Sequence, residues 1–220
     1  MKFNFHVILK ISGVIAMIVA LSMLPAAIIS AVCGESEALR AFLLSMLPFF
    51  AAGCLIFVFT KPLSASLRMR EGIFIVSWCW MLSSLLGSLP YMLCGAAPGF
   101  VDAFFESASA FTTTGATLMP DLEALPKGMF FWRALSNWLG GMGILIFAVS
   151  ILPALGIGAL NIAKAETPGP TLDKMTPRMS DSARLLYGIY IALTAAEFLL
   201  LVGRMGPFEA AVHSFASVGT

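Results

Sequence analysis

The chain has 220 residues, of which 59% are hydrophobic and 11% are charged, and its formal net charge is +1. Soluble domains carry about 25% charged residues, so this composition excludes an ordinary soluble protein and indicates an integral membrane protein. A net charge so close to zero gives no reason to expect a nucleic-acid partner.

Five apolar stretches are long enough to cross a bilayer, which takes about 20 helical residues. In chain order they occupy residues 7–32, 38–60, 72–94, 129–160 and 183–202. The first is longer than the roughly 7–15 apolar residues of a signal peptide core, so we expect it to be retained as a helix. Pro48 lies inside the second and is expected to kink it, because proline cannot donate a backbone hydrogen bond.

Between the third and fourth spans lies the sequence FFESASAFTTTGAT, residues 104–117. It is too short and too polar to cross a bilayer. We expect a short helix over residues 102–111 and a non-helical loop over 112–117, where threonine and glycine disfavour helix. Non-helical backbone at membrane depth is tolerated only when protein buries it or when it lines a wet cavity. A polar loop at the membrane surface is the alternative.

Such a loop could bind a dehydrated monovalent cation, which takes several oxygen ligands in place of its hydration shell. The threonines offer carbonyl and hydroxyl oxygens, and the glycine can adopt a positive φ that lets consecutive carbonyls point the same way. The short helix would direct the negative end of its dipole toward the cation. The candidate ligands are Thr112, Thr113, Thr114 and Gly115.

Two acidic residues of the short helix, Asp102 and Glu106, are expected toward the outer mouth, where they could concentrate cations. A helix cap and a first-turn charge are the more ordinary roles for such residues. In the fourth span, Gly140, Gly141 and Gly143 clear side chains from one region. Close helix packing by small residues is the ordinary explanation, and approach of an ion path to the backbone is the alternative.

Four more polar residues in or next to apolar segments are candidates for function. Glu197 lies deep in a span, where a carboxylate is costly; it could pair with another helix or line an ion path. His213 is expected to make a satisfied polar contact, although a pH-dependent role is an alternative. Arg133 and Asn137, near the start of the fourth span, are expected to anchor it at the interface.

An internal repeat is visible when the chain is shifted by 107 residues, which aligns residues 102–113 with residues 209–220. The identities are few and the register is uncertain by one. Each copy follows an apolar span, and the order is span, short helix and Thr/Gly loop both times. Interrupted helices in internal repeats are how membrane proteins build ion sites between their halves. The chain is expected to stop within the second unit.

The distribution of Lys and Arg predicts the orientation, because cytoplasmic loops carry the excess. The N-terminus and the links at 61–71 and 160–184 hold nine of them, and the opposite side holds four. The N-terminus is therefore predicted to be cytoplasmic, and the Thr-rich stretch must enter and leave on the outer side. A re-entrant loop and a long external loop both satisfy this count.

The segments FTTTGAT at 111–117 and NWLGGMGILIFAVSILPALG at 137–156 closely resemble the Trk/Ktr/HKT superfamily of potassium transporters, and the TrkH branch in particular. MTPR at 175–178 and HSFASVGT at 213–220 fit the same branch. The resemblance implies an all-α multi-pass protein of the bacterial inner membrane. Its units of helix, pore helix, filter loop and helix surround a central pore.

By this resemblance, residues 1–70 hold two extra N-terminal helices, 71–160 the first pore repeat, 161–182 a cytoplasmic loop and 183–220 the start of the second repeat. Gly115 is the key glycine of the first filter, which favours potassium over sodium. The second filter begins with Val218, Gly219 and Thr220. Family members are homodimers and bind a cytosolic nucleotide-binding regulatory ring of the TrkA type. Potassium is the transported ion, and no organic cofactor is implied.

Three functions remain open on the residues alone. The first is a potassium uptake pore, the second an ion-coupled secondary transporter in which Glu197 is central, and the third a membrane scaffold subunit that transports nothing. The sequence contains no nucleophile–base pair, metal cluster or phosphate-binding loop, so an enzyme is not expected. One and a half repeats cannot surround an ion, so we expect transport only from the longer parent protein.

Overall fold

The structure is a computed structural model that describes residues 5–60, 69–122, 124–151 and 179–220. All regular secondary structure in these ranges is helical. The elements are α1 (Phe5–Ser22), α2 (Leu24–Val32), α3 (Ser36–Phe59), α4 (Met69–Leu93), α5 (Phe100–Phe111), α6 (Lys127–Ile151), α8 (Met179–Val202) and α9 (Pro207–Gly219). The prediction of an all-α polytopic membrane protein is confirmed.

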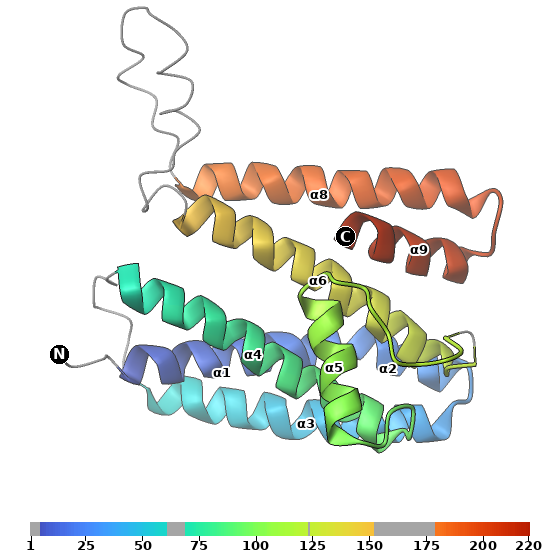
Figure 1. Ribbon diagram of the computed structural model, residues 1–220, viewed down its shortest axis with the longest axis horizontal. Helices are drawn as coiled ribbons and strands as arrows, with labels where there is room; N and C mark the ends of the chain where they lie inside the picture. Colours follow the sequence, from blue (N-terminus) through green and yellow to red (C-terminus); the bar gives the residue numbers. More distant parts are fainter. Residues whose placement is uncertain (1–4, 61–68, 123, 152–178) are drawn as a thin grey trace, which may run out of the picture.

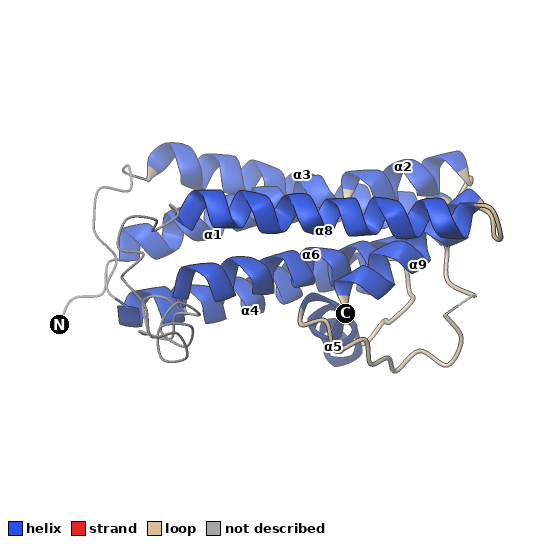
Figure 2. Ribbon diagram, turned by 90° about the horizontal axis from the view of Figure 1, so that it is seen from above, coloured by secondary structure: helices blue, strands red, loops and turns tan. Residues whose placement is uncertain are grey.

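The long helices run along one common direction, and the short helix α5 crosses it (Figures 1 and 2). Helices α1, α3 and α4 form one group, and α8 and α9 lie on the other side of α6, which runs obliquely between them (Figure 1). Helix α6 contacts α5 on one side and both α8 and α9 on the other. It is therefore the element that joins the two short helices.

Four helical segments in the described ranges are long and apolar enough to cross a membrane: Ile8–Val32, Ser36–Phe59, Gly72–Leu93 and Arg184–Val202. They confirm the first, second, third and fifth predicted spans to within a few residues. The first span is divided at Met23, the N-cap of α2, where Pro25 occupies a first-turn position and cannot donate a backbone hydrogen bond. Helix α3 continues through Pro48.

The fourth predicted span, residues 129–160, corresponds to α6 over its first part. Helix α6 has 25 residues, which at 1.5 Å per residue is long enough to cross the apolar core of a bilayer. Residues 152–160 and the first part of the expected cytoplasmic loop at 161–182, with its MTPR segment, lie outside the described residues. Residues 179–182 belong to α8, which begins at Met179.

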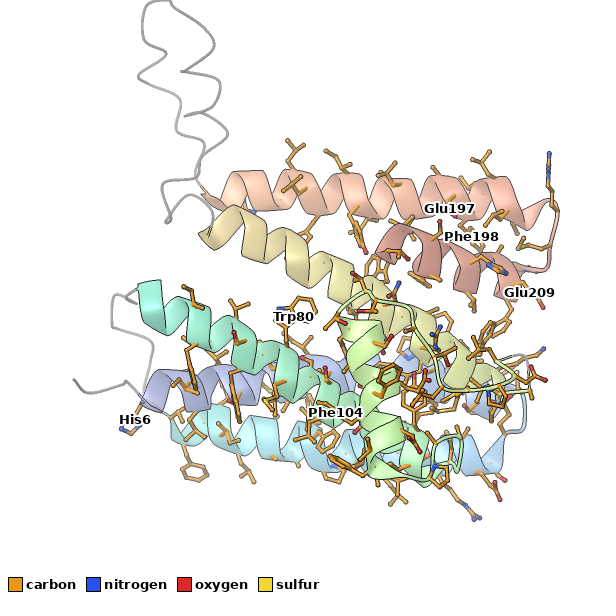
Figure 3. All side chains as sticks on the ribbon, viewed as in Figure 1. His6, Trp80, Phe104, Glu197, Phe198 and Glu209 are labelled. Carbon is orange, nitrogen blue, oxygen red and sulfur yellow. The ribbon has the colours of Figure 1, made fainter. Side chains whose placement is uncertain are left out.

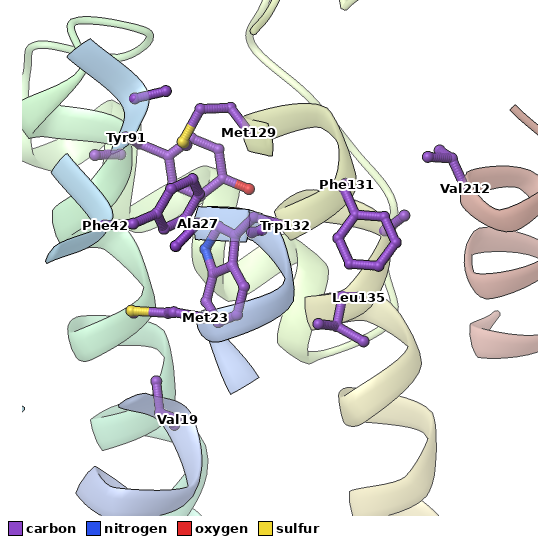
Figure 4. Close-up of a cluster of buried hydrophobic side chains, with 14 of the residues drawn as sticks. Val19, Met23, Ala27, Phe42, Tyr91, Met129, Phe131, Trp132, Leu135 and Val212 are labelled. Atoms are coloured by element: carbon purple, nitrogen blue, oxygen red, sulfur yellow. The ribbon is translucent and has the colours of Figure 1, made fainter. Parts of the chain in front are cut away.

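The packing core is centred on Trp132 of α6, which is fully buried (Figure 4). Its ring meets Phe42 and Phe111 edge-on, with ring centroids 6.4 and 6.2 Å apart. This geometry is favoured by aromatic quadrupoles. Its indole N–H donates to the carbonyl of Gly87 at 3.2 Å. Phe111 is the last residue of α5, so the core fixes the point where the Thr-rich loop begins.

The N-terminus of α6 is held by a carboxylate from a distant turn. Glu35, just before α3, accepts hydrogen bonds from the backbone N–H groups of Lys127 at 2.6 Å and Gly128 at 3.1 Å. The first N–H groups of a helix have no partner within it, and the helix dipole favours a negative charge there. Glu35 thus positions α6 against the first helices of the chain.

Candidate ion-binding site

The Thr-rich loop begins with a tight helix ending. At the C-terminus of α5, the N–H of Thr113 donates to the carbonyl of Ala110 and the N–H of Thr114 to that of Ser109, both at 2.9 Å. These two bonds define a Schellman motif, whose central residue adopts the left-handed conformation and is usually glycine. Here that residue is Thr113, with a φ of +56°. A β-branched residue is strained in this conformation.

Gly115 also has a positive φ, +72°, as the sequence predicted. Apart from its two chain neighbours, no described residue lies within 4 Å of the place where its Cβ would be, so the glycine is required by backbone conformation and not by space. The loop thus has two left-handed residues, Thr113 and Gly115. Its threonines directly follow the C-terminal end of α5, which is the negative end of the helix dipole.

The loop carbonyls divide into two groups. Those of Gly115 and Ala116 accept hydrogen bonds, from Arg133 Nη2 at 2.9 Å and from Ser109 Oγ at 2.6 Å. The carbonyls of residues 112–114 accept no hydrogen bond from any part of the chain that the structure describes. The hydroxyls of Thr112 and Thr114 lie 2.8 Å apart. Three consecutive carbonyl oxygens are thus available for a cation or for water.

Glu106 is buried and paired, whereas the sequence analysis expected it toward the outer mouth, where it could concentrate cations. Its side chain is 1% exposed. Its Oε1 accepts hydrogen bonds from Thr117 Oγ1 at 2.7 Å and from the Leu118 N–H at 2.6 Å. Its Oε2 lies 3.4 Å from Arg133 Nε. The sequence suggests an exposed side chain because an acidic residue in a short helix is normally solvated. In the structure, the loop that follows α5 covers Glu106.

Arg133 also differs from the expectation of a simple interfacial anchor, since its guanidinium binds both Glu106 and the Gly115 carbonyl. The spacing of 27 positions between Glu106 and Arg133 gives no local signal for this pair. Asp102 lies exposed in the first turn of α5, and the N-cap itself is Gly99. Asp102 therefore has the ordinary role that the sequence analysis considered for it, that of a first-turn charge.

The second short helix, α9, repeats the first. The N-caps Gly99 and Gly206 are separated by 107 positions, and each helix has an acidic residue in its first turn. Thr112 follows α5, and Thr220 follows the described part of α9. Both threonine hydroxyls donate to the carbonyl four residues earlier. The two short helices therefore share a glycine N-cap, a first-turn acidic residue and a threonine that bonds back to the helix.

The predicted second filter segment lies at the end of the described chain. Val218 and Gly219 belong to α9, and Thr220 follows them. The end of α9 is held by Asn137 of α6, whose Nδ2 lies 3.0 Å from the Ala216 carbonyl and 3.4 Å from the hydroxyl of Thr220. Asn137 therefore contacts the second segment and is not confined to an anchoring role.

The glycines of α6 allow both short helices to approach it closely. A Cβ on Gly140 would overlap the Phe111 carbonyl at the end of α5, and a Cβ on Gly141 would overlap the Tyr190 hydroxyl and approach the Gly219 carbonyl. Helix packing by small residues, the ordinary explanation, therefore holds at these positions. The same region brings the ends of α5 and α9 to neighbouring faces of α6.

A pocket of about 270 Å³ lies between these ends. Its polar lining includes Gly115 and Arg133 on one side and Asn137, His213 and Thr220 on the other. His213 is exposed, and it occupies the position of α9 that corresponds to Glu106 in the 107-residue register. The structure therefore brings Gly115 of the predicted first segment and Thr220 of the second to one pocket, whereas Thr112, Thr113 and Thr114 are not among its lining residues.

Glu197 is not part of this site. It is half-buried on α8, where that helix runs beside α9 (Figure 3), and it makes no hydrogen bond or ion pair with the described residues. Its neighbour Phe198 lines an apolar pocket with Trp138 and Phe215. Neither the pairing role nor the ion-path role considered for Glu197 is tested by these contacts.

The fold and this site define a class of protein: a helical, multi-pass membrane protein whose repeated units each combine a long helix with a short helix that stops inside the molecule. Comparison with known proteins gives the family. The TrkH family, described as cation transport protein, matches residues 39–215. The chain belongs to this family.

Relatives include the Trk system potassium uptake protein TrkH of Halomonas elongata, 38% identical over 218 residues, and that of Escherichia coli (strain K12), 36% identical over 219 residues. Each alignment covers 98% of this chain and 45% of the relative. The crystal structure of the potassium transporter TrkH from Vibrio parahaemolyticus matches with a TM-score of 0.81 and 34% identity, covering 97% of this chain and 42% of that one. The chain thus spans less than half the length of these relatives.

Proposed function

We propose that the full-length protein takes up potassium through a central pore. In this proposal, the carbonyls of Thr112, Thr113 and Thr114 and the reversal at Gly115 form the first part of its selectivity filter. The supporting observation is the run of three loop carbonyls at the C-terminal end of α5 that accept no hydrogen bond from the described residues. The relatives named as Trk potassium uptake proteins support the choice of potassium.

The same proposal includes the second filter segment. Thr220, together with Val218 and Gly219 at the end of α9, would contribute to the ring of oxygen ligands around the ion. The approach of both helix ends to the pocket beside Asn137 supports this arrangement. A selectivity filter needs oxygen ligands from several directions, and one loop supplies them from one side only.

We also propose the organisation that the resemblance implies. Residues 1–70 would be the two extra N-terminal helices, 71–160 the first pore repeat, 161–182 a cytoplasmic loop and 183–220 the beginning of the second repeat. The protein would lie in the bacterial inner membrane with a cytoplasmic N-terminus, assemble as a homodimer and bind a cytosolic nucleotide-binding subunit of the TrkA type. The excess of Lys and Arg on one side supports the orientation.

The test is potassium uptake in bacteria that lack their own potassium systems. The full-length protein is expressed as wild type, with Gly115→Ser and with Gly95→Ser. Gly95 is a matched control, because it has a φ of +76° and open space around it, but it lies in the turn after α4. Both substitutions therefore impose a similar backbone strain.

We expect wild type and Gly95→Ser to restore growth at low potassium and to prefer potassium over sodium, and Gly115→Ser to lose most of that preference. Equal preference in all three would remove residues 112–115 from the filter and favour the coupled transporter with Glu197. Glu197→Gln would then abolish transport, whereas the pore proposal expects it to leave selectivity intact. Absence of any ion uptake by the wild type would favour a scaffold subunit.

A further inference from the structure

We propose that Glu106 and Arg133 form a positioning pair that ends the ion-binding run of carbonyls at Thr114 and thereby sets ion selectivity. Neither residue would touch the ion. The inference rests on the proposed pore function and adds to it the residues that hold the first filter loop in shape. The observation that points to it is the guanidinium of Arg133, which joins the buried carboxylate of Glu106 to the Gly115 carbonyl.

The pair joins three separate parts of the fold. Arg133 comes from α6 and Glu106 from α5, and both bind the loop that follows α5. Arg133 Nε lies 3.4 Å from Glu106 Oε2, while Nη2 donates to the Gly115 carbonyl at 2.9 Å. A guanidinium has several donors in one rigid plane, so the two contacts fix the loop relative to both helices.

Glu106 holds the loop on the other side of Ala116. Its Oε1 accepts from the hydroxyl of Thr117 and from the N–H of Leu118, and Ser109 donates to the Ala116 carbonyl. The loop is therefore held at four consecutive residues, 115–118. A carboxylate that is 1% exposed is costly unless it is paired and hydrogen-bonded, so the pair and the loop geometry depend on one another.

This arrangement decides which carbonyls can reach an ion. The Gly115 oxygen is occupied by a donor that carries a full positive charge, so this oxygen is a poor ligand for a cation. The carbonyls of residues 112–114 have no such donor among the described residues. Selectivity depends on the number and field strength of the coordinating carbonyls. Loss of the Arg133 contact would free the Gly115 carbonyl to bind an ion and would loosen the loop, so both the number of ligands and their rigidity would change.

The pair acts through geometry and not through charge alone, and this can be measured. Lysine at position 133 keeps the positive charge, but a single ammonium cannot reproduce the planar fork that reaches both acceptors. We therefore expect Arg133→Lys and Glu106→Gln in the full-length protein each to lower the potassium-to-sodium uptake ratio about tenfold, as loss of a hydrogen bond to a charged group would. Uptake is normalised to the amount of protein in the membrane.

Glu35→Gln is the matched control. Glu35 is also a carboxylate that binds two backbone N–H groups and positions α6, but it contacts no residue of the loop. We expect its uptake ratio to equal that of wild type, even where its thermal stability falls. A merely structural role for Glu106 and Arg133 predicts the same behaviour for all three variants, so the comparison separates positioning of the filter from general stability.

Wild-type potassium-to-sodium ratios in both Arg133→Lys and Glu106→Gln would overturn the inference while leaving the pore function in place. Failure of the wild-type protein to take up potassium would overturn both. If the two variants do not reach the membrane, Thr117→Val decides, because it removes one hydrogen bond to Glu106 and leaves the charge pair present. A lowered ratio in Thr117→Val then supports the inference, and an unchanged ratio rejects it.

Discussion

The carbonyl oxygen of Phe111, at the end of α5, lies directly against the backbone of Gly140 in α6. The proposed filter loop starts at the next residue, Thr112, so the distance between α5 and α6 at this point determines where the loop begins. Only glycine permits the observed distance, because a Cβ at position 140 would overlap the carbonyl group.

We expect Gly140→Ala to lower both the stability and the ion selectivity of the full-length protein. The added methyl group meets backbone atoms, which cannot rotate away, and overpacking of this kind costs about 1–3 kcal/mol. Unfolding temperature in detergent and the potassium-to-sodium uptake ratio measure the two effects. Gly143→Ala is the control, because its Cβ would lie 3.5 Å from the ring of Trp80, an ordinary contact. Equal behaviour of the two variants would refute this account of α6.

Thr113 provides a second test, because it is a β-branched residue at a φ of +56° in a Schellman motif. The left-handed conformation costs an ordinary residue roughly 1–2 kcal/mol. We expect Thr113→Gly to raise the unfolding temperature, since the relief of strain exceeds the added entropy of the unfolded chain. Thr113 makes no side-chain hydrogen bond with the described residues.

The control for this substitution is Thr114→Gly. Thr114 is not among the residues with positive φ, and its hydroxyl lies 2.8 Å from that of Thr112. We expect this variant to be less stable than wild type, because glycine adds entropy to the unfolded chain without relieving strain. Destabilisation by both substitutions would contradict the assignment of strain to Thr113.

Asn137 and Ser136 are neighbours on α6 that should respond in opposite ways. Asn137 donates to the Ala216 carbonyl at 3.0 Å, whereas the buried Ser136 Oγ has no hydrogen-bond partner among the described residues. We expect Asn137→Ala to destabilise the full-length protein by about 1 kcal/mol, and Ser136→Ala to be neutral or stabilising. Thermal unfolding of the two variants measures the difference. Equal losses would show that Asn137 does not hold the end of α9.

The orientation can be tested through the cysteines. Cys33 is exposed in the turn after α2, on the side predicted to face outward, and Cys94 is half-buried in the turn after α4. Burial raises the pKa of the Cys94 thiol. Because the thiolate is the reactive form, both its burial and its raised pKa should slow the labelling of Cys94.

We therefore expect a membrane-impermeant maleimide, applied from outside, to label Cys33 first and to lose that signal in Cys33→Ser. Raising the pH should speed the labelling of Cys94, since more of its thiol then ionises. Labelling of Cys33 only in inside-out vesicles would reverse the proposed orientation.

Much of the fold follows from local properties of the sequence. The length of each apolar stretch predicts the spans, and the change from FFESASAF to TTTGAT predicts the end of α5 and the positive φ of Gly115. These features depend on the hydrophobicity and conformational preferences of neighbouring residues. These features can therefore be predicted without knowing which residues pack against them.

The weak internal repeat shows where local reasoning stops. The alignment at 107 positions matches the N-caps Gly99 and Gly206, but it does not show what holds each short helix in place. For α9 this includes Asn137, which lies 79 positions from Ala216 in the sequence.

The sequence alone determined that this is a membrane protein with a polar, Thr-rich interruption between two spans, because composition and apolar length suffice for that. Only the tertiary structure decided which loop carbonyls accept hydrogen bonds from the described residues and which do not. That division depends on Glu106 being buried by the returning loop and on Arg133 reaching it from another helix. Such contacts arise when α6 packs against α5 through Gly140. The residues near Glu106 and Arg133 in the sequence do not reveal how closely these two helices approach.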